Sequence, residues 1–224
     1  MEELGKIHQL VFHIAGYPIR LNIEVMIMTW IVIVVLIVFG WLCSSRRAMV
    51  PNRFQIVGEL LVSKLYELTE DAMGKYLAQT YAPLICALFM FLVLCNWLGI
   101  IPHLHEPTKD LNTPLSLGLM GFVIAHYAGI KSKGFKHYAK EYFQPMFFMM
   151  PLNVIGELAK VVSISFRLFG NIMGGSIIIT VVSYLTYSIV LPPLLNAFFG
   201  LFVGTIQAFV FTMLTVVYIS VQVK

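Results

Sequence analysis

Residues 156–176 read GELAKVVSISFRLFGNIMGGS and place one arginine, Arg167, inside a long apolar segment. No Asp, Glu, Lys or Arg follows it until Lys224. A charged side chain near the middle of a membrane-spanning helix costs at least about 2.5–3.5 kcal/mol, so the few that occur usually serve a function. The segment therefore makes Arg167 a candidate functional residue of a membrane protein.

The composition of the whole chain also indicates a membrane protein. Of its 224 residues, 59% are hydrophobic and only 12% are charged, whereas soluble domains average about 25% charged residues. Half the usual charge does not cover the surface of a globule in water, so we expect lipid to be the solvent for much of this surface. The three cysteines lie in apolar stretches and are interpreted as packing residues.

Five segments are apolar and long enough to cross a bilayer as helices, which takes about 20 residues each. Residues 53–75 instead repeat apolar side chains every three or four positions. This pattern predicts an amphipathic helix on the membrane surface or, alternatively, against a soluble partner. With no internal repeat and no break in composition, we predict an all-α integral membrane protein with one domain over residues 1–224. The five expected spans are residues 25–45, 77–101, 111–130, 151–190 and 194–221.

Basic residues predict the orientation of these spans. The connections at residues 44–75 and 131–140 are rich in Lys and Arg, whereas the connection between the second and third spans holds only Lys109. Basic loops stay in the cytoplasm, so we expect the N-terminus outside and Lys224 in the cytoplasm. Topology accounts for the net charge of +4, and no nucleic-acid partner is expected.

Arg167 has no obvious anion in its own chain. Glu157 precedes it by ten residues, but Lys160 lies only three residues from Glu157 and is better placed to pair with it. The alternative is an arginine that reaches the membrane surface or closes an ion pair between helices. The residues expected to share its face are small or weakly polar, which suits close approach of another helix but also fits an ordinary packing seam. They are Ser163, Gly170, Asn171 and Gly174.

The last span carries a comparable stripe of small residues. Gly200, Gly204, Ala208 and Thr212 recur every four positions, and Gln207 lies on a neighbouring face. We expect the Gln207 amide to hydrogen-bond to Arg167 or to line a wet path. The alternative is an isolated amide that bonds to backbone.

Four of these stretches resemble subunit a of the F-type ATP synthase. They are residues 163–171 (SISFRLFGN), 207–211 (QAFVF), 215–218 (TVVY) and 107–113 (PTKDLNT). The resemblance rests on motifs from the second span onward and on topology alone for the first span.

The resemblance implies a membrane stator beside a ring of c subunits, held by peripheral-stalk b subunits. Its last two helices would form a long, tilted hairpin against the ring. Two offset half-channels would lead H⁺ or Na⁺ to and from the ring carboxylates, and rotation of the ring would drive ATP synthesis elsewhere in the complex. No catalytic residue, cofactor or metal is expected in this chain, and the location would be a bacterial inner membrane.

The resemblance also assigns roles to individual residues. Arg167 would be the essential charge that faces the rotor, with Asn171, Gln207 and Ser176 on the ion path. Small residues facing the rotor would be Ser163, Gly170, Gly174 and Gly204. Further candidates for lining the channels are Asp110, Asn112, Asn153, Glu157 and Tyr218.

Two positions depart from the family pattern and bear on the coupling ion. Many proton-translocating relatives have an acid nine residues after the arginine, where this chain has Ser176. Some bacterial relatives have a histidine seven residues before the glutamine, where this chain has Gly200. Neutral oxygens coordinate hard cations but do not take up protons, so we favour Na⁺ over H⁺. H⁺ stays open because water or acids such as Asp110 and Glu157 can carry protons.

The histidines give weaker signals. His103, His105 and Glu106 cluster in the outer loop, where we expect them to line a channel mouth or face solvent rather than bind a metal. His126 is interpreted as a packed or hydrogen-bonded side chain, with a channel role as the alternative. Two rival functions remain at this point: a self-contained channel or transporter that uses Arg167 as an anion site, and a membrane anchor that transports nothing.

Overall fold

The computed structural model describes residues 9–14, 17–44, 53–101, 104–142, 150–185 and 191–223. The chain begins with an antiparallel hairpin of β1 (Gln9–Ile14) and β2 (Tyr17–Asn22), in which Gln9 lies opposite Asn22. The sequence had not suggested this hairpin. It leads directly into α1 (Ile23–Ser44).

Within the described residues, five helices are long and apolar enough to cross a membrane, which confirms the predicted all-α membrane fold. Besides α1 they are α3 (Lys75–Trp97) with the turn η1 (Leu98–Ile100), α4 (Asn112–Lys133), α6 (Met150–Leu185), and a last helix made of three consecutive parts. These parts are α7 (Leu191–Ala197), the π-helical η4 (Phe198–Val203) and α8 (Gly204–Val223).

The last helix begins earlier than expected. Pro192 and Pro193 lie in the first turn of α7 and do not end the helix before them. Proline is tolerated there because the first backbone N–H groups of a helix have no partner within the helix.

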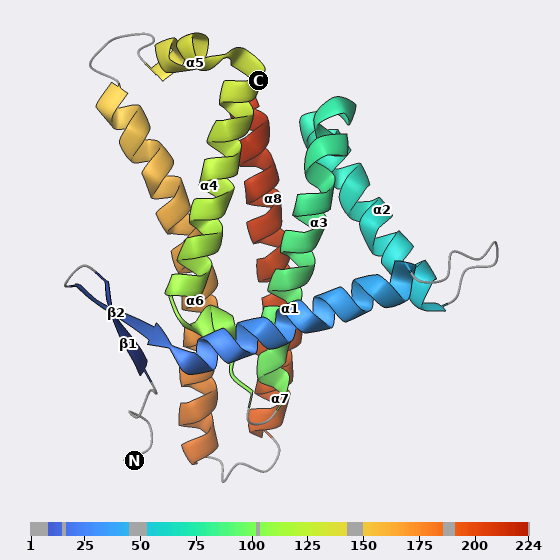
Figure 1. The fold of residues 1–224 in the computed structure, drawn as a ribbon. Coiled ribbons are helices and arrows are strands. Elements are labelled where there is room, and N and C mark those ends of the chain that lie inside the picture. Colours follow the sequence, from blue (N-terminus) through green and yellow to red (C-terminus); the bar gives the residue numbers. More distant parts are fainter. Residues whose placement is uncertain are drawn as a thin grey trace.

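Helix α8 lies at the centre of the fold, packed against α3, α4 and α6 (Figure 1). One core cluster joins Leu92 of α3, Leu168 of α6 and Phe211 of α8, all fully buried. The turn η2 (Pro107–Lys109) precedes α4, and the short helix α5 (Phe135–Tyr142) follows α4.

The small-residue stripe of the last helix is an internal packing seam. Gly200, Gly204, Ala208 and Thr212 are all buried. A Cβ on Gly204 would lie 2.9 Å from the Asn96 Cβ of α3. Asn96 also donates a hydrogen bond of 2.8 Å from Nδ2 to the Gly204 carbonyl. Gly204 therefore faces α3, and the prediction that it faces a rotor is wrong.

Helix α2 (Arg53–Met73) packs beside α3 and is not one of the five long apolar helices. It buries Leu65, Thr69 and Met73 and leaves other apolar side chains, such as Leu60, exposed. Gly74 joins the two helices at a φ of 84°, a conformation that glycine adopts without strain. The helix is amphipathic as expected, and its position on a membrane surface stays a prediction.

The last two long helices exceed the thickness of a bilayer. At about 1.5 Å per residue, the 36 residues of α6 span about 54 Å. The hydrocarbon core measures only about 30 Å. A helix of this length fits within the core only when strongly tilted, and the tilt expected for the hairpin stays a prediction. Helix α1, in contrast, crosses α3, α4, α6 and α8 at a steep angle in Figure 1.

Candidate functional site

Arg167 points away from the protein core. Its neighbours Ile164 and Leu168 are buried against α3 and α8, whereas Arg167 is exposed. Among the described residues it makes no hydrogen bond or ion pair. The Lys160 Nζ donates a hydrogen bond of 2.6 Å to the Glu157 Oε1, which confirms the expected local ion pair. Arg167 is therefore a fixed positive charge on an outer face of α6, available to an anion outside the chain.

The surface around Arg167 is open. Ser163 and Gly170 are exposed, and a Cβ added to Gly170 or Gly174 would meet no atom within 4 Å. At Gly175, on the buried side of the same helix, an added Cβ would lie 2.9 Å from the ring of Phe199. The small residues that flank Arg167 thus leave room for another molecule.

Asn171 and Gln207 join α6 to α8 one turn beyond Arg167. The Asn171 Nδ2 donates to the Gln207 Oε1 at 2.8 Å, so Gln207 binds Asn171 rather than Arg167. Gln207 is 4% exposed, and its Nε2 has no hydrogen-bond partner in the part of the chain described. An unsatisfied buried donor costs about 1–3 kcal/mol, so this amide is available to a ligand or water.

A polar cavity of about 150 Å³ lies on the C-terminal side of Arg167 along α6. Its volume is large enough for several water molecules, at about 30 Å³ for each molecule of liquid water. Ser176 and Gly200, the two positions that depart from the family pattern, both line it, and so does Asn171. Its other lining residues are Gly99, Leu104, His105, Glu106, Lys109, Ile172, Ile179, Thr180, Asn196 and Phe199.

A second polar cavity of about 280 Å³ lies on the N-terminal side of Arg167. It contains the Glu157–Lys160 pair, and Lys160 also stands 5.8 Å from the centre of the Tyr218 ring. Two polar cavities therefore flank Arg167 along α6. The residues lining the second one are Leu152, Asn153, Gly156, Glu157, Lys160, Val221 and Gln222.

Two expected channel residues lie elsewhere. The Asp110 Oδ1 accepts a 3.0 Å hydrogen bond from the backbone N–H of Asn112, at the start of α4. A short acidic side chain that bonds to the backbone two residues on is a common way to begin a helix or turn. Neither Asp110 nor Asn112 lines the two cavities beside Arg167, because this contact holds them at the end of α4.

The outer-loop acid that does reach a cavity is Glu106. Its carboxylate lies against Gly99, where a Cβ would come within 1.8 Å of the Glu106 Oε1. The loop is held in place by Asn96, whose Oδ1 accepts a 2.9 Å hydrogen bond from the Thr108 hydroxyl. The sequence placed Glu106 near a channel mouth but gave no signal that it shares a cavity with Ser176.

The histidines separate into two environments. His105 is exposed at the first cavity, and His103 lies outside the described residues. No group of three or more potential metal ligands occurs in the described ranges. The His126 Nδ1 lies 3.0 Å from the Phe122 carbonyl oxygen, and its ring stacks on Phe122 with centroids 3.9 Å apart. His126 is thus a packed, hydrogen-bonded side chain, as expected.

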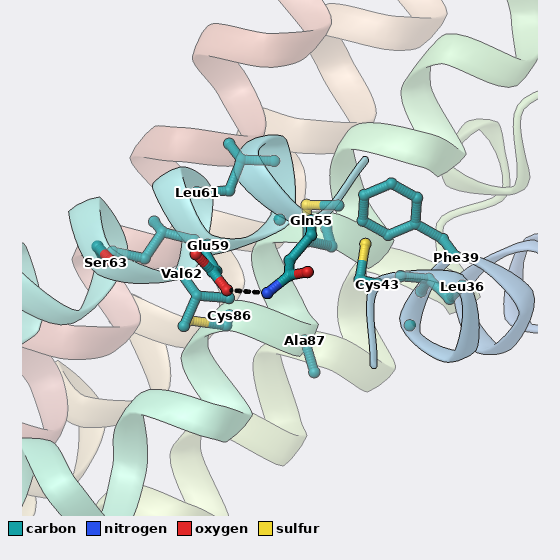
Figure 2. A pocket seen from close by; sticks show the side chains of 14 residues that line it. Leu36, Phe39, Cys43, Gln55, Glu59, Leu61, Val62, Ser63, Cys86 and Ala87 are labelled. Carbon is teal, nitrogen blue, oxygen red and sulfur yellow. Dashed lines mark hydrogen bonds between the residues drawn. The ribbon is translucent and has the colours of Figure 1, made fainter. Parts of the chain in front are cut away.

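A larger cavity of about 900 Å³ lies between α1, α2 and α3 (Figure 2). Its lining is mostly apolar, and the Gln55 Nε2 donates to the Glu59 Oε1 there at 2.7 Å. No residue of α6 or α8 lines it. It is therefore separate from the arrangement around Arg167.

Comparisons with known proteins show the family of the chain. A family model described as ATP synthase A chain matches residues 26–220, a range that includes the whole or most of each of the five long helices. A protein of Moorella thermoacetica named ATP synthase subunit a is 36% identical over 94% of this chain and 94% of its own length. Proteins of the same name from Desulforamulus reducens and Acidothermus cellulolyticus are 34% and 38% identical, over 93% and 78% of this chain and 82% and 66% of their own lengths. The chain therefore belongs to the family of ATP synthase subunit a, the non-catalytic stator subunit in the membrane sector of the bacterial rotary ATP synthase.

Proposed function

We propose that Arg167 and its two flanking cavities couple ion flow to rotation of the c-ring. The single observation that carries this proposal is an exposed arginine without an anion in the described chain, set in an open face of an apolar helix. Lipid alone is a poor environment for such a charge. A carboxylate that arrives from a neighbouring ring gives the arginine its partner.

The proposed role of Arg167 follows from its charge. Opposite charges attract strongly where the effective dielectric constant is low, and a nearby cation favours the ionised form of a carboxylate. An arginine stays protonated under any condition the protein meets. Arg167 would thus make each passing rotor carboxylate release its ion, and would prevent a loaded carboxylate from crossing directly between the two cavities.

The two cavities are the proposed half-channels. Asn171 and Ser176 belong to the one on the C-terminal side of Arg167, and Asn153 and Glu157 belong to the other. By the distribution of basic loops, the first would open to the outside and the second to the cytoplasm. The N-terminus would then lie outside and the C-terminus in the cytoplasm.

The test is ATP synthesis by the complete complex in lipid vesicles, with Arg167→Ala and Arg167→Lys. We expect both variants to assemble and both to lose coupled synthesis, because lysine can deprotonate in the bilayer and lacks the planar guanidinium. Synthesis near the wild-type rate in Arg167→Lys would contradict the role proposed for Arg167. Transport by the purified chain alone would favour the rival channel, and full function of Arg167→Ala would favour the rival anchor.

The coupling ion is proposed as H⁺ or Na⁺. The case for Na⁺ rested on neutral residues at positions 176 and 200, but Glu106 and His105 line the same cavity as Ser176 and Gly200. Titratable groups are therefore present after all, and residues 176 and 200 no longer discriminate between the two ions. Synthesis that continues at full rate without Na⁺ would reject Na⁺ coupling.

Peripheral-stalk b subunits are proposed as further partners. Support comes from the family assignment and from the exposure of α1, the least buried of the five long helices. Apolar side chains such as Trp30, Ile37 and Trp41 are largely exposed on it. Cross-linking from cysteines placed on α1 in the intact complex tests whether b subunits or lipid cover this surface.

A further inference from the structure

We propose that Glu106 is the residue that takes up the translocated cation in the cavity on the C-terminal side of Arg167. The ligand is a monovalent cation, either H⁺, which the carboxylate binds covalently, or Na⁺, which it coordinates. This inference rests on the half-channel proposed above and names its ion-handling group. Neither the family pattern at positions 176 and 200 nor the motif of the outer loop assigns this role to Glu106.

The position of the carboxylate carries the inference. Glu106 is half-buried and lines the cavity, and among the described residues its carboxylate forms no hydrogen bond or ion pair. Asp110, four residues later, is instead bonded to the backbone of Asn112. Of the two acids in this loop, only Glu106 combines a place in the cavity with an uncommitted carboxylate.

The surroundings leave little else to bind a cation. The ionisable groups that line the cavity are His105, Glu106 and Lys109, all from the outer loop. The walls formed by α6, α7 and η4 add only neutral polar groups. These are Asn171, Ser176, Thr180 and Asn196. Carboxylate and neutral oxygens together form the ligand set that hard cations prefer.

The cavity also leads toward the rotor face. Asn171 lines it and donates to Gln207, whose buried Nε2 is left without a partner in the described chain. Asn171 lies about one helical turn from Arg167 along α6, and Gln207 lies beside Asn171 on α8. A cation taken up at Glu106 would therefore enter a polar route that ends beside the charge that handles the rotor carboxylate.

Gly99 leaves the space that the carboxylate occupies. A Cβ there would collide with the Oε1 and Cδ of Glu106, so the flexible end of that side chain would have to shift. Gly99→Ala therefore moves the carboxylate without removing it. This gives a second variant that tests position rather than charge.

The experiment measures ATP synthesis by the complete complex in vesicles, at limiting concentrations of the cation on the outer side. Glu106→Gln is expected to lower the rate about 100-fold or more, the usual contribution of a positioned acid or base. Gly99→Ala should lower it in the same direction. The control Glu24→Gln neutralises an exposed carboxylate on α1 that lines neither polar cavity and should stay within about twofold of wild type.

A second-site variant separates ion handling from a structural role. Adding Ser176→Glu to Glu106→Gln returns a carboxylate to the same cavity from its opposite wall and should restore most of the rate. If the ion is H⁺, Glu106→Gln flattens the dependence of the rate on outer pH. If it is Na⁺, the variant raises the outer Na⁺ concentration that gives half-maximal rate, because a carboxylate ligand is lost.

Two results would overturn the inference. One is a Glu106→Gln complex that synthesises ATP within twofold of wild type. The other is a loss of rate that Ser176→Glu does not rescue and that leaves the pH and Na⁺ dependence unchanged, which would mean that Glu106 only supports the loop. Arg167→Ala in the same vesicles keeps the two proposals apart. If that variant is inactive while Glu106→Gln is normal, only the inference about Glu106 fails.

Discussion

Replacing Gly170 by leucine should slow rotation without harming the fold. A Cβ at Gly170 meets no atom within 4 Å, so the leucine causes no collision inside the chain. Glycine is about 1 kcal/mol less favourable than alanine in a helix, and leucine is close to alanine. The chain itself should therefore keep its stability or gain up to about 1 kcal/mol.

The same leucine should obstruct a ring that passes over this face. Forcing extra methylene groups into a packed contact costs about 1–3 kcal/mol. If that cost falls on each rotational step, the rate drops about 5- to 150-fold. The measurements are thermal unfolding of the purified chain, assembly of the complex by subunit mass, and ATP synthesis in vesicles.

Gly40→Leu supplies the matched control. Gly40 is also exposed on an apolar helix and would also meet no atom within 4 Å, but it lies on α1 at the cavity between α1, α2 and α3, away from the Arg167 face. Complexes whose subunit masses show that the b subunits are present should synthesise ATP normally. Equal rates for Gly170→Leu and Gly40→Leu would refute the idea that the Arg167 face meets the rotor.

Two further expectations concern stability. Gly204→Ala places a Cβ 2.9 Å from the Asn96 Cβ, and this overpacking should lower the unfolding free energy by about 1–3 kcal/mol, measurable by thermal unfolding in detergent. Tyr138→Phe removes the 2.8 Å hydrogen bond from the Tyr138 hydroxyl to the buried Gln222 Oε1 and should cost about 1–3 kcal/mol in the same assay. No loss in Gly204→Ala would mean that α3 and α8 can separate slightly, and no loss in Tyr138→Phe would mean that Gln222 finds another donor.

Features that depend only on residues within one helix were predictable from the sequence. The long charge-free segments give the helices directly, and the three-residue spacing of Glu157 and Lys160 gives their ion pair. The same spacing correctly leaves Arg167 without a partner in the described chain. In each case the partners are so close in sequence that helix geometry alone brings them together.

Features that depend on contacts between residues far apart in the sequence were not predictable. The periodicity of the last helix marks a small-residue stripe, but the pattern does not say that Asn96, more than a hundred residues away, fills the space above Gly204. Gln207 was expected near Arg167 and instead bonds to Asn171. The sequence does not distinguish Asp110 from Glu106, because both are acids of the same outer loop. Only the folding of the loop over Gly99 places Glu106 in the cavity.

The length of α6 gives the two proposed half-channels their separation. Glu157 in one cavity and Ser176 in the other lie nineteen residues apart on α6, which is about 28 Å along the helix. A helix of about 54 Å is longer than a core of about 30 Å, so a tilt would place the two cavities apart in the plane of the membrane as well as in depth, with Arg167 near the middle. An upright helix would stack the proposed half-channels above one another, whereas a tilted helix would separate them sideways, so that under the proposed function an ion would pass from one to the other only by riding the ring.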